Sequence, residues 1–154
     1  MSEILLLRHG ETLWNIEGRI QGHGDSALSA EGIAQAEALA RRIAGERPDR
    51  LYSSDLGRAR QTMEPIARAT GLAPRIDPAL RERCYGAFEG RPWPEIERDF
   101  PQEYAAHVAG DPGAKPAGGE SMLEFRDRAV GALTRIAETS GGGKVVIVAH
   151  GGVL

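Results

Sequence analysis

Cysteine is scarce in this sequence. Cys84 is the only one among 154 residues, so no disulfide can form within the chain. Because disulfides accumulate in oxidising compartments, cysteine usage leaves the cytoplasm as the expected location.

The apolar run nearest the start of the chain is short. It covers residues 4–7, far fewer than a membrane span or the core of a signal peptide needs, and the acidic Glu3 precedes it where a basic flank is expected. We therefore expect neither an export signal nor a membrane partner.

Neither sign of charge dominates the composition. Lys and Arg number 19 against 22 Asp and Glu, which gives a formal net charge of -3. This balance excludes a bulk attraction to nucleic acid or to anionic lipid. Any site for an anion has to be built locally.

Two common ligand motifs are missing as well. No group of metal-binding residues has usable spacing, and the glycines at 141–143 with Lys144 are followed by Val145, where a nucleotide-binding loop needs Ser or Thr. The sequence therefore predicts no metal and no other cofactor.

What is present fits one domain over residues 1–154, since 41% of the residues are hydrophobic. Apolar runs predict strands at residues 4–7, 50–53 and 145–149, the first of them central and covered on both faces. Strands alternating with helical patterns favour an α/β fold, a three-layer sandwich whose mainly parallel sheet has helices on both faces.

Three helices are expected, over residues 29–43, 55–70 and 121–136. Ser29 is a good N-cap for the first, and Ser121 with Glu124 forms a capping box for the third. The apolar stripes that should face the sheet in the first and third helices are Ile33, Ala36, Leu39, Ala40 and Ile43, and Met122, Phe125, Ala129, Leu133 and Ile136. Between them, five prolines interrupt short helical patches at about 91–117, which indicates a cap-like insertion.

Charged residues follow each predicted strand. Arg8 and His9 end the first, Arg58 comes shortly after the second, and His150 follows the third. Because the carboxyl ends of parallel strands share one edge of the sheet, these side chains should meet there. Two arginines and two histidines make an anion pocket suited to a phosphoryl group, and a neutral imidazole in it could attack phosphorus.

Residues 7–15, Leu-Arg-His-Gly-Glu-Thr-Leu-Trp-Asn, resemble the Arg-His-Gly signature of the histidine phosphatase superfamily, in which phosphoglycerate mutases also belong. Further matches follow in order at residues 21–22, 28–32, 53–62, 80–82, 86, 89–90, 119–121 and 146–154. Because the series spans nearly the whole chain, it is far more specific than a bare Arg-His-Gly.

The resemblance implies a phosphohistidine intermediate on His9. Arg8, Arg58 and His150 would hold the phosphoryl oxygens, and further hydrogen bonds to the substrate would come from Asn15, Gln21, Gly22 and Gly151. No metal is needed in this scheme, because the arginines supply the positive charge.

Glu82 would be the general acid that protonates the leaving alcohol and then the base that activates water. Glu11 and Glu89 are alternative acids. We assign them structural roles, Glu11 in tying down the nucleophile loop and Glu89 in a bond near Gly90.

Two activities fit this pattern: hydrolysis of small phosphorylated metabolites, and a mutase reaction on phosphoglycerate. Hydrolysis is favoured, because the insertion offers only the scattered Arg91, Arg98 and Lys115 where mutases of this family carry an adjacent arginine pair. Mutases also tend to have Asn where this chain has Gly152. The resemblance does not name the physiological substrate.

The third alternative is an inactive relative that binds phosphorylated ligands. In this fold a helix should start near Gly152 and lead to a last strand, yet the sequence ends at Leu154. The sequence therefore predicts a truncated domain that lacks its C-terminal helix and last strand, or a partner chain that fills the gap. The sequence does not fix the oligomeric state, and a homodimer is one of the states it allows.

Overall fold

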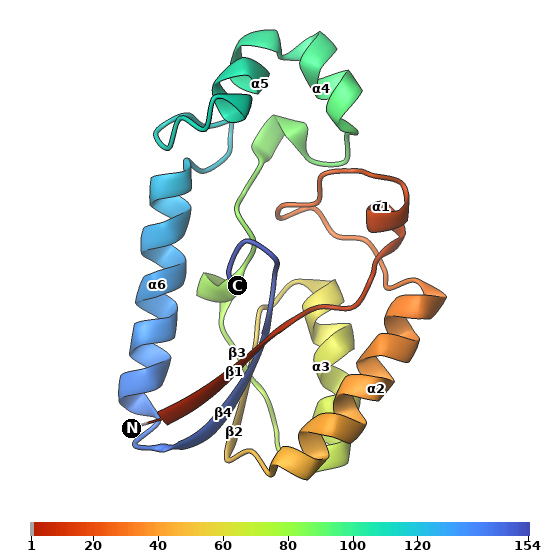
Figure 1. Ribbon diagram of the computed structural model, residues 1–154, viewed down its shortest axis with the longest axis vertical. Helices are drawn as coiled ribbons and strands as arrows, with labels where there is room; N and C mark the ends of the chain where they lie inside the picture. Colours follow the sequence, from red (N-terminus) through yellow and green to blue (C-terminus); the bar gives the residue numbers. More distant parts are fainter. Residues whose placement is uncertain (1) are drawn as a thin grey trace.

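A computed structural model describes residues 2–154. Its four strands are β1 (Ser2–Arg8), β2 (Arg50–Ser53), β3 (Arg75–Ile76) and β4 (Gly143–Ala149). They form one sheet in the order β1-β4-β2-β3, and every pairing is parallel (Figure 1). The register aligns Arg8 with Ala149 and Ser53 with Val148, so these strands deliver the residues that follow them to one edge.

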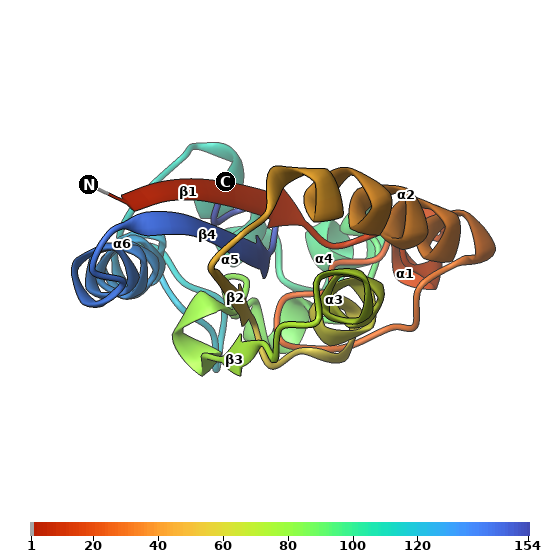
Figure 2. The same cartoon turned by 90° about the horizontal axis from the view of Figure 1, so that it is seen from below.

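Helices cover both faces of the sheet, which confirms the predicted three-layer α/β class. On one face α6 (Met122–Thr139) packs against the side chains of Val145 and Ile147. On the other face α2 (Ala30–Glu46) and α3 (Gly57–Thr70) pack against Val146 and Val148 (Figure 2). Alternate residues of β4 thus enter opposite layers of the core.

The prediction that residues 4–7 form a central strand is wrong. β1 pairs only with β4 and lies at the edge of the described sheet, and Ile4, Leu5, Leu6 and Leu7 are half-buried. The central position belongs to β4, whose residues 145–149 are completely buried. Apolar side chains on both faces indicated burial between two layers, but they carried no information about neighbours within the sheet.

Helix boundaries agree with prediction at the caps. The side chain of Ser29 accepts a hydrogen bond from Gly32 N at the start of α2, and Ser121 and Glu124 form the capping box of α6. α2 runs on to Glu46 and ends at Arg47, which has a left-handed φ of 52°. α3 begins at Gly57 rather than residue 55.

Two residues assigned to the buried stripes are exposed. Ile33 is 56% exposed on α2 and Met122 is 45% exposed on α6. Both lie in the first turn of their helix, which extends past the sheet that the later turns cover.

The chain between α3 and α6 carries the shorter elements. After β3 come the 3-10 turns η1 (Pro78–Leu80) and η2 (Gly86–Phe88), and then α4 (Trp93–Asp99) and α5 (Pro101–Val108), which lie within the segment expected to be a cap. Figure 1 shows α4 and α5 beyond the carboxyl ends of the strands, together with α1 (Leu13–Ile16). Residues 150–154 form a turn after β4. Within residues 2–154, no helix has the length and apolar character to cross a membrane.

Candidate active site

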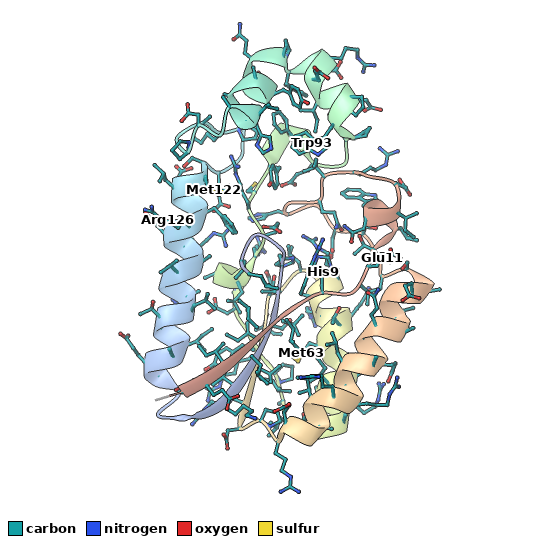
Figure 3. All side chains as sticks on the ribbon, in the orientation of Figure 1. His9, Glu11, Met63, Trp93, Met122 and Arg126 are labelled. Carbon is teal, nitrogen blue, oxygen red and sulfur yellow. The ribbon has the colours of Figure 1, made fainter. Side chains whose placement is uncertain are left out.

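His9 lies directly after β1, at the carboxyl edge of the sheet (Figure 3). It is 7% exposed, and its main-chain N–H donates to the carbonyl oxygen of Ala149 at 3.1 Å. That bond continues the β1–β4 ladder by one residue, so the sheet fixes the backbone from which the imidazole projects.

The two ring nitrogens of His9 have different partners. Nδ1 lies 2.7 Å from the carbonyl oxygen of Gly10, which can only accept, so Nδ1 carries the proton. Nε2 faces the Nε–H of Arg58 at 3.3 Å and therefore carries the lone pair. The pKa of His9 is lowered to about 4, mainly by burial; the charges of Arg58 and Arg8 act in the same direction, and the hydrogen bond with the Gly10 carbonyl opposes them. The ring is therefore neutral at physiological pH.

Arg58 is 1% exposed and projects from the first turn of α3. Its guanidinium donates to the carbonyl oxygens of Gly22 at 2.7 Å and Gly24 at 2.8 Å, and to the Asp25 carboxylate at 3.2 Å. Burial lowers the pKa of Arg58, but arginine stays protonated at neutral pH. Since several donors are tied to one loop, the position of the cation beside His9 is fixed.

Asp25 was not identified from the sequence. One of its carboxylate oxygens accepts the main-chain N–H of Gly57 at 2.5 Å, and the other accepts that of Arg58 at 3.3 Å. Leu56, the N-cap residue of α3, has no side chain that can cap the helix, so Asp25 caps it from a distant loop. A missing local cap before Gly57 was the available signal, but sequence alone gives no indication of which loop supplies the carboxylate.

His150 follows β4 and is completely buried. Its ring centroid lies 5.3 Å from that of His9, and its Nε2 lies 2.8 Å from the hydroxyl of Ser54. Burial and the charges of Arg58 and His9 lower the pKa of His150 to about 2. Among residues 2–154, Nδ1 of His150 is the only fully buried side-chain nitrogen or oxygen without a hydrogen-bond partner.

Arg8 and Gly151 meet at the same edge. A Cβ added at Gly151 would lie 3.6 Å from the Arg8 guanidinium carbon, an ordinary van der Waals distance, so the two residues are direct neighbours. Arg8 is exposed and, with His9, Glu11, Asn15 and Gln35, lines an open pocket of about 290 Å³. It is the arginine of the site that is exposed to solvent.

Asn15, Gln21 and Gly22 make contacts within the protein. Thr12 caps α1, its N–H and hydroxyl facing the amide oxygen of Asn15, and the hydroxyl also lies 2.9 Å from the amide oxygen of Gln21. The carbonyl of Gly22 serves Arg58. Some of the oxygens of these residues are therefore already engaged in hydrogen bonds with Thr12 and Arg58.

Glu82 reaches the site from the segment after η1. One carboxylate oxygen accepts from Gly152 N at 3.1 Å, and the other accepts from Arg83 N at 2.9 Å. Because Gly152 lies two residues after His150, the first bond brings the Glu82 carboxylate close to the His150 loop. The two alternative acids are committed elsewhere. Glu11 accepts from the Ser29 hydroxyl at 2.7 Å, and Glu89 accepts the main-chain N–H groups of His23, Gly24 and Tyr85.

The positive charge at this edge is supplied by side chains. Among residues 2–154 no group of three His, Cys, Asp or Glu residues is placed to hold a metal ion. Arg58 and Arg8 supply the charge, and the neutral imidazoles of His9 and His150 lie beside them, a set that suits an anion with several oxygens.

The comparisons with known proteins point to one family. A family model described as histidine phosphatase superfamily (branch 1) matches residues 4–154. A metal-independent phosphoserine phosphatase of Arabidopsis thaliana is 43% identical over all of this chain, which spans 66% of that relative's length. A protein of Yersinia pestis named "Probable phosphoglycerate mutase GpmB" is 42% identical over 98% of this chain and 70% of its own.

Solved structures give the same result. A mycobacterial glucosyl-3-phosphoglycerate phosphatase in complex with VO3 superimposes with a TM-score of 0.89 at 34% identity, over 99% of this chain and 77% of that one. With fold, sequence and family model in agreement, this chain belongs to the histidine phosphatase superfamily, branch 1.

Proposed function

We propose that this protein hydrolyses small phosphomonoesters through a phosphohistidine on His9. The observation that carries the proposal is the state of the His9 ring. Its Nδ1 proton is held by the Gly10 carbonyl, its Nε2 lone pair lies in the pocket beside Arg58, and its pKa is about 4. A buried, neutral and oriented imidazole next to a cation is what attack on a phosphoryl group requires.

In the first step the Nε2 lone pair of His9 forms a bond to phosphorus as the ester P–O bond breaks. Glu82 protonates the departing oxygen. In the second step Glu82 takes a proton from water, whose oxygen attacks phosphorus, and the N–P bond breaks to return His9 and release inorganic phosphate. Arg8, Arg58 and His150 face the negative oxygens in both steps.

The substrate class follows from the site and from the relatives. Two of the phosphatases found by comparison are named for phosphoserine and for glucosyl-3-phosphoglycerate, both small phosphorylated metabolites with a carboxylate. An exposed Arg8 beside an open pocket can bind such a substrate without metal. We therefore propose a small, acidic phosphorylated metabolite and a metal-independent reaction.

The mutase reaction is the second candidate, because the Yersinia relative is named as one. The cations of residues 91–117 support hydrolysis instead. Arg91 and Arg98 both pair with Asp99, at 3.1 and 2.7 Å, and Lys115 pairs with Glu124 at 2.9 Å. A carboxylate of a bound phosphoglycerate would have to displace these internal partners.

Steady-state kinetics tests the proposal. Wild-type protein should release phosphate from p-nitrophenyl phosphate in EDTA, His9→Ala should fall to background, and His107→Ala, a histidine stacked on Trp93 in α4, should keep the activity. Equal background rates for wild type and His9→Ala would contradict the proposal. Vanadate binding without turnover would then favour the inactive relative, and exchange on 3-phosphoglycerate faster than hydrolysis would favour the mutase.

A further inference from the structure

We propose that Ser54 is a positioning residue that holds the proton of His150 on Nδ1, so that this ring donates a hydrogen bond to a phosphoryl oxygen. The identity of the bound oxygen rests on the proposed function. The position of the proton does not, because it follows from contacts inside the protein.

Ser54 follows β2 in the chain and is completely buried. Its main-chain N–H donates to the Val148 carbonyl at 3.0 Å, which fixes the serine against the end of β4. Its hydroxyl oxygen lies 2.8 Å from Nε2 of His150. Leu56 N donates to the same oxygen over a longer 3.4 Å. Among residues 2–154 the Ser54 hydroxyl has no other side-chain or main-chain partner.

The direction of the Ser54–His150 bond follows from counting protons. A hydroxyl has one proton to donate and two lone pairs. Leu56 N–H occupies a lone pair, and a main-chain N–H cannot accept, so the only acceptor within reach of the Ser54 proton is Nε2 of His150. A proton on Nε2 would leave the buried Ser54 hydroxyl without an acceptor, which is costly. Nε2 therefore accepts, and Nδ1 carries the ring proton.

This assignment explains the one unpartnered atom of the site. Nδ1–H of His150 is buried, makes no hydrogen bond within the described chain and belongs to a ring 5.3 Å from His9. An orphan donor at that place fits an anion oxygen. The opposite tautomer would present a lone pair to the lone pairs of the phosphoryl group and repel it. Because the pKa of His150 is about 2, the ring is neutral in the free protein and its tautomer decides the sign of the contact.

The two histidines thus use the same tautomer for opposite purposes. In His9 the Nδ1 proton is bound by Gly10, and the Nε2 lone pair, which faces Arg58, would be the nucleophile. In His150 the Nε2 lone pair is bound by Ser54 and the free Nδ1 proton faces the ligand.

The test compares Ser54→Ala with Ser54→Thr, which keeps a hydroxyl, and with Ser53→Ala. Ser53 is an equally buried neighbour whose hydroxyl donates to the main-chain oxygen of Ser54 at 2.9 Å, while the hydroxyl that bonds to the His150 ring is that of Ser54. NMR of protein with 15N-labelled histidine rings reports directly which nitrogen of His150 is protonated. Vanadate affinity and the separate values of kcat and KM report the consequence.

We expect Nδ1–H in wild type, Ser54→Thr and Ser53→Ala, and a loss of this single tautomer in Ser54→Ala. Vanadate affinity and kcat should fall about 10-fold to 100-fold in Ser54→Ala only. The same Nδ1–H tautomer in Ser54→Ala as in wild type would overturn the proposal, whatever the activity. Lost tautomer control in a chain that never hydrolyses phosphoesters would support the positioning role and count against the proposed function.

Discussion

Arg58 Nε and His9 Nε2 lie 3.3 Å apart, and both side chains are almost completely buried. One residue comes from the start of α3 and the other from the end of β1, 49 positions earlier in the chain. The contact places a fixed cation beside the Nε2 lone pair of His9. In the proposed mechanism this cation would stabilise the negative oxygens of the phosphoryl group during transfer.

Replacement of Arg58 by lysine keeps the positive charge but removes the forked set of guanidinium N–H donors. Lysine cannot reproduce the bonds to Gly22, Gly24 and Asp25 at once, so the cation loses its fixed position. We expect Arg58→Lys to lower kcat about 100-fold in a protein that still shows wild-type circular dichroism. A kcat within threefold of wild type would show that the geometry of the fork is unimportant.

Asp25 should matter for both stability and rate. Asp25→Ala removes the cap of α3 and the anchor of Arg58, so it should cost about 1–2 kcal/mol in urea unfolding and lower kcat about 10-fold. Asp127→Ala is the matched control, because Asp127 pairs only with the exposed neighbour Arg126 and should cost less than about 0.5 kcal/mol. Equal effects of the two variants would refute the anchoring role.

Glu82 should show its role through the leaving group. An alkyl alcohol needs a proton to depart, whereas p-nitrophenolate leaves without one. Glu82→Gln should therefore slow phosphorylation of His9 by an alkyl phosphate at least about 10-fold more than phosphorylation by p-nitrophenyl phosphate, as measured in single turnovers.

Glu89→Gln is the control for this comparison. Glu89 binds three main-chain N–H groups and should change the rates with both substrates by the same factor. If Glu82→Gln also changed both rates equally, another residue would be the general acid.

Two glycines of α2 should respond oppositely to alanine. A Cβ at Gly32 would lie 2.0 Å from the carbonyl oxygen of Glu11, where the helix crosses the nucleophile loop, so Gly32→Ala should destabilise the fold by about 2 kcal/mol or more. A Cβ at Gly45 meets nothing within 4 Å, and Gly45→Ala should stabilise it by about 0.5–1 kcal/mol. Urea midpoints of both variants measure this difference, and a shift in the same direction would contradict it.

Acid should destabilise the fold in the window between the unfolded and folded pKa values of the buried histidines. His9 and His150 have pKa values of about 4 and about 2 in the fold against an ordinary 6.5. The unfolded chain therefore binds more protons below pH 6.5, and the free energy of unfolding falls as the pH falls. From pH 6.5 to pH 5 each histidine should cost about 2 kcal/mol.

Urea unfolding across this window, in wild type and in His150→Gln, isolates one of these contributions. The pH slope should fall by about one proton in the variant. An unchanged slope would show that His150 titrates normally.

The sequence was sufficient to predict the three layers and the strand ends that carry Arg8, His9 and His150. The spacing of apolar residues, from which these were predicted, is a local property of the sequence. It did not give the neighbours within the sheet, and so β1 was wrongly placed at the centre. Nor did it give Asp25 or Ser54. Their importance lies in contacts with residues 33 and 96 positions away, and a lone Asp or Ser in a polar segment has no local pattern that marks it.

A phosphohistidine on His9 can be trapped and located in the chain. Glu82→Gln protein, in which release to water should be slow, is mixed with p-nitrophenyl phosphate, quenched, and mapped by mass spectrometry at alkaline pH, where phosphohistidine survives. The proposed mechanism predicts one acid-labile phosphoryl group per chain, located on His9 and absent when His9→Ala is added to Glu82→Gln. Turnover of wild type with no label on His9, or label that survives the loss of His9, would contradict it.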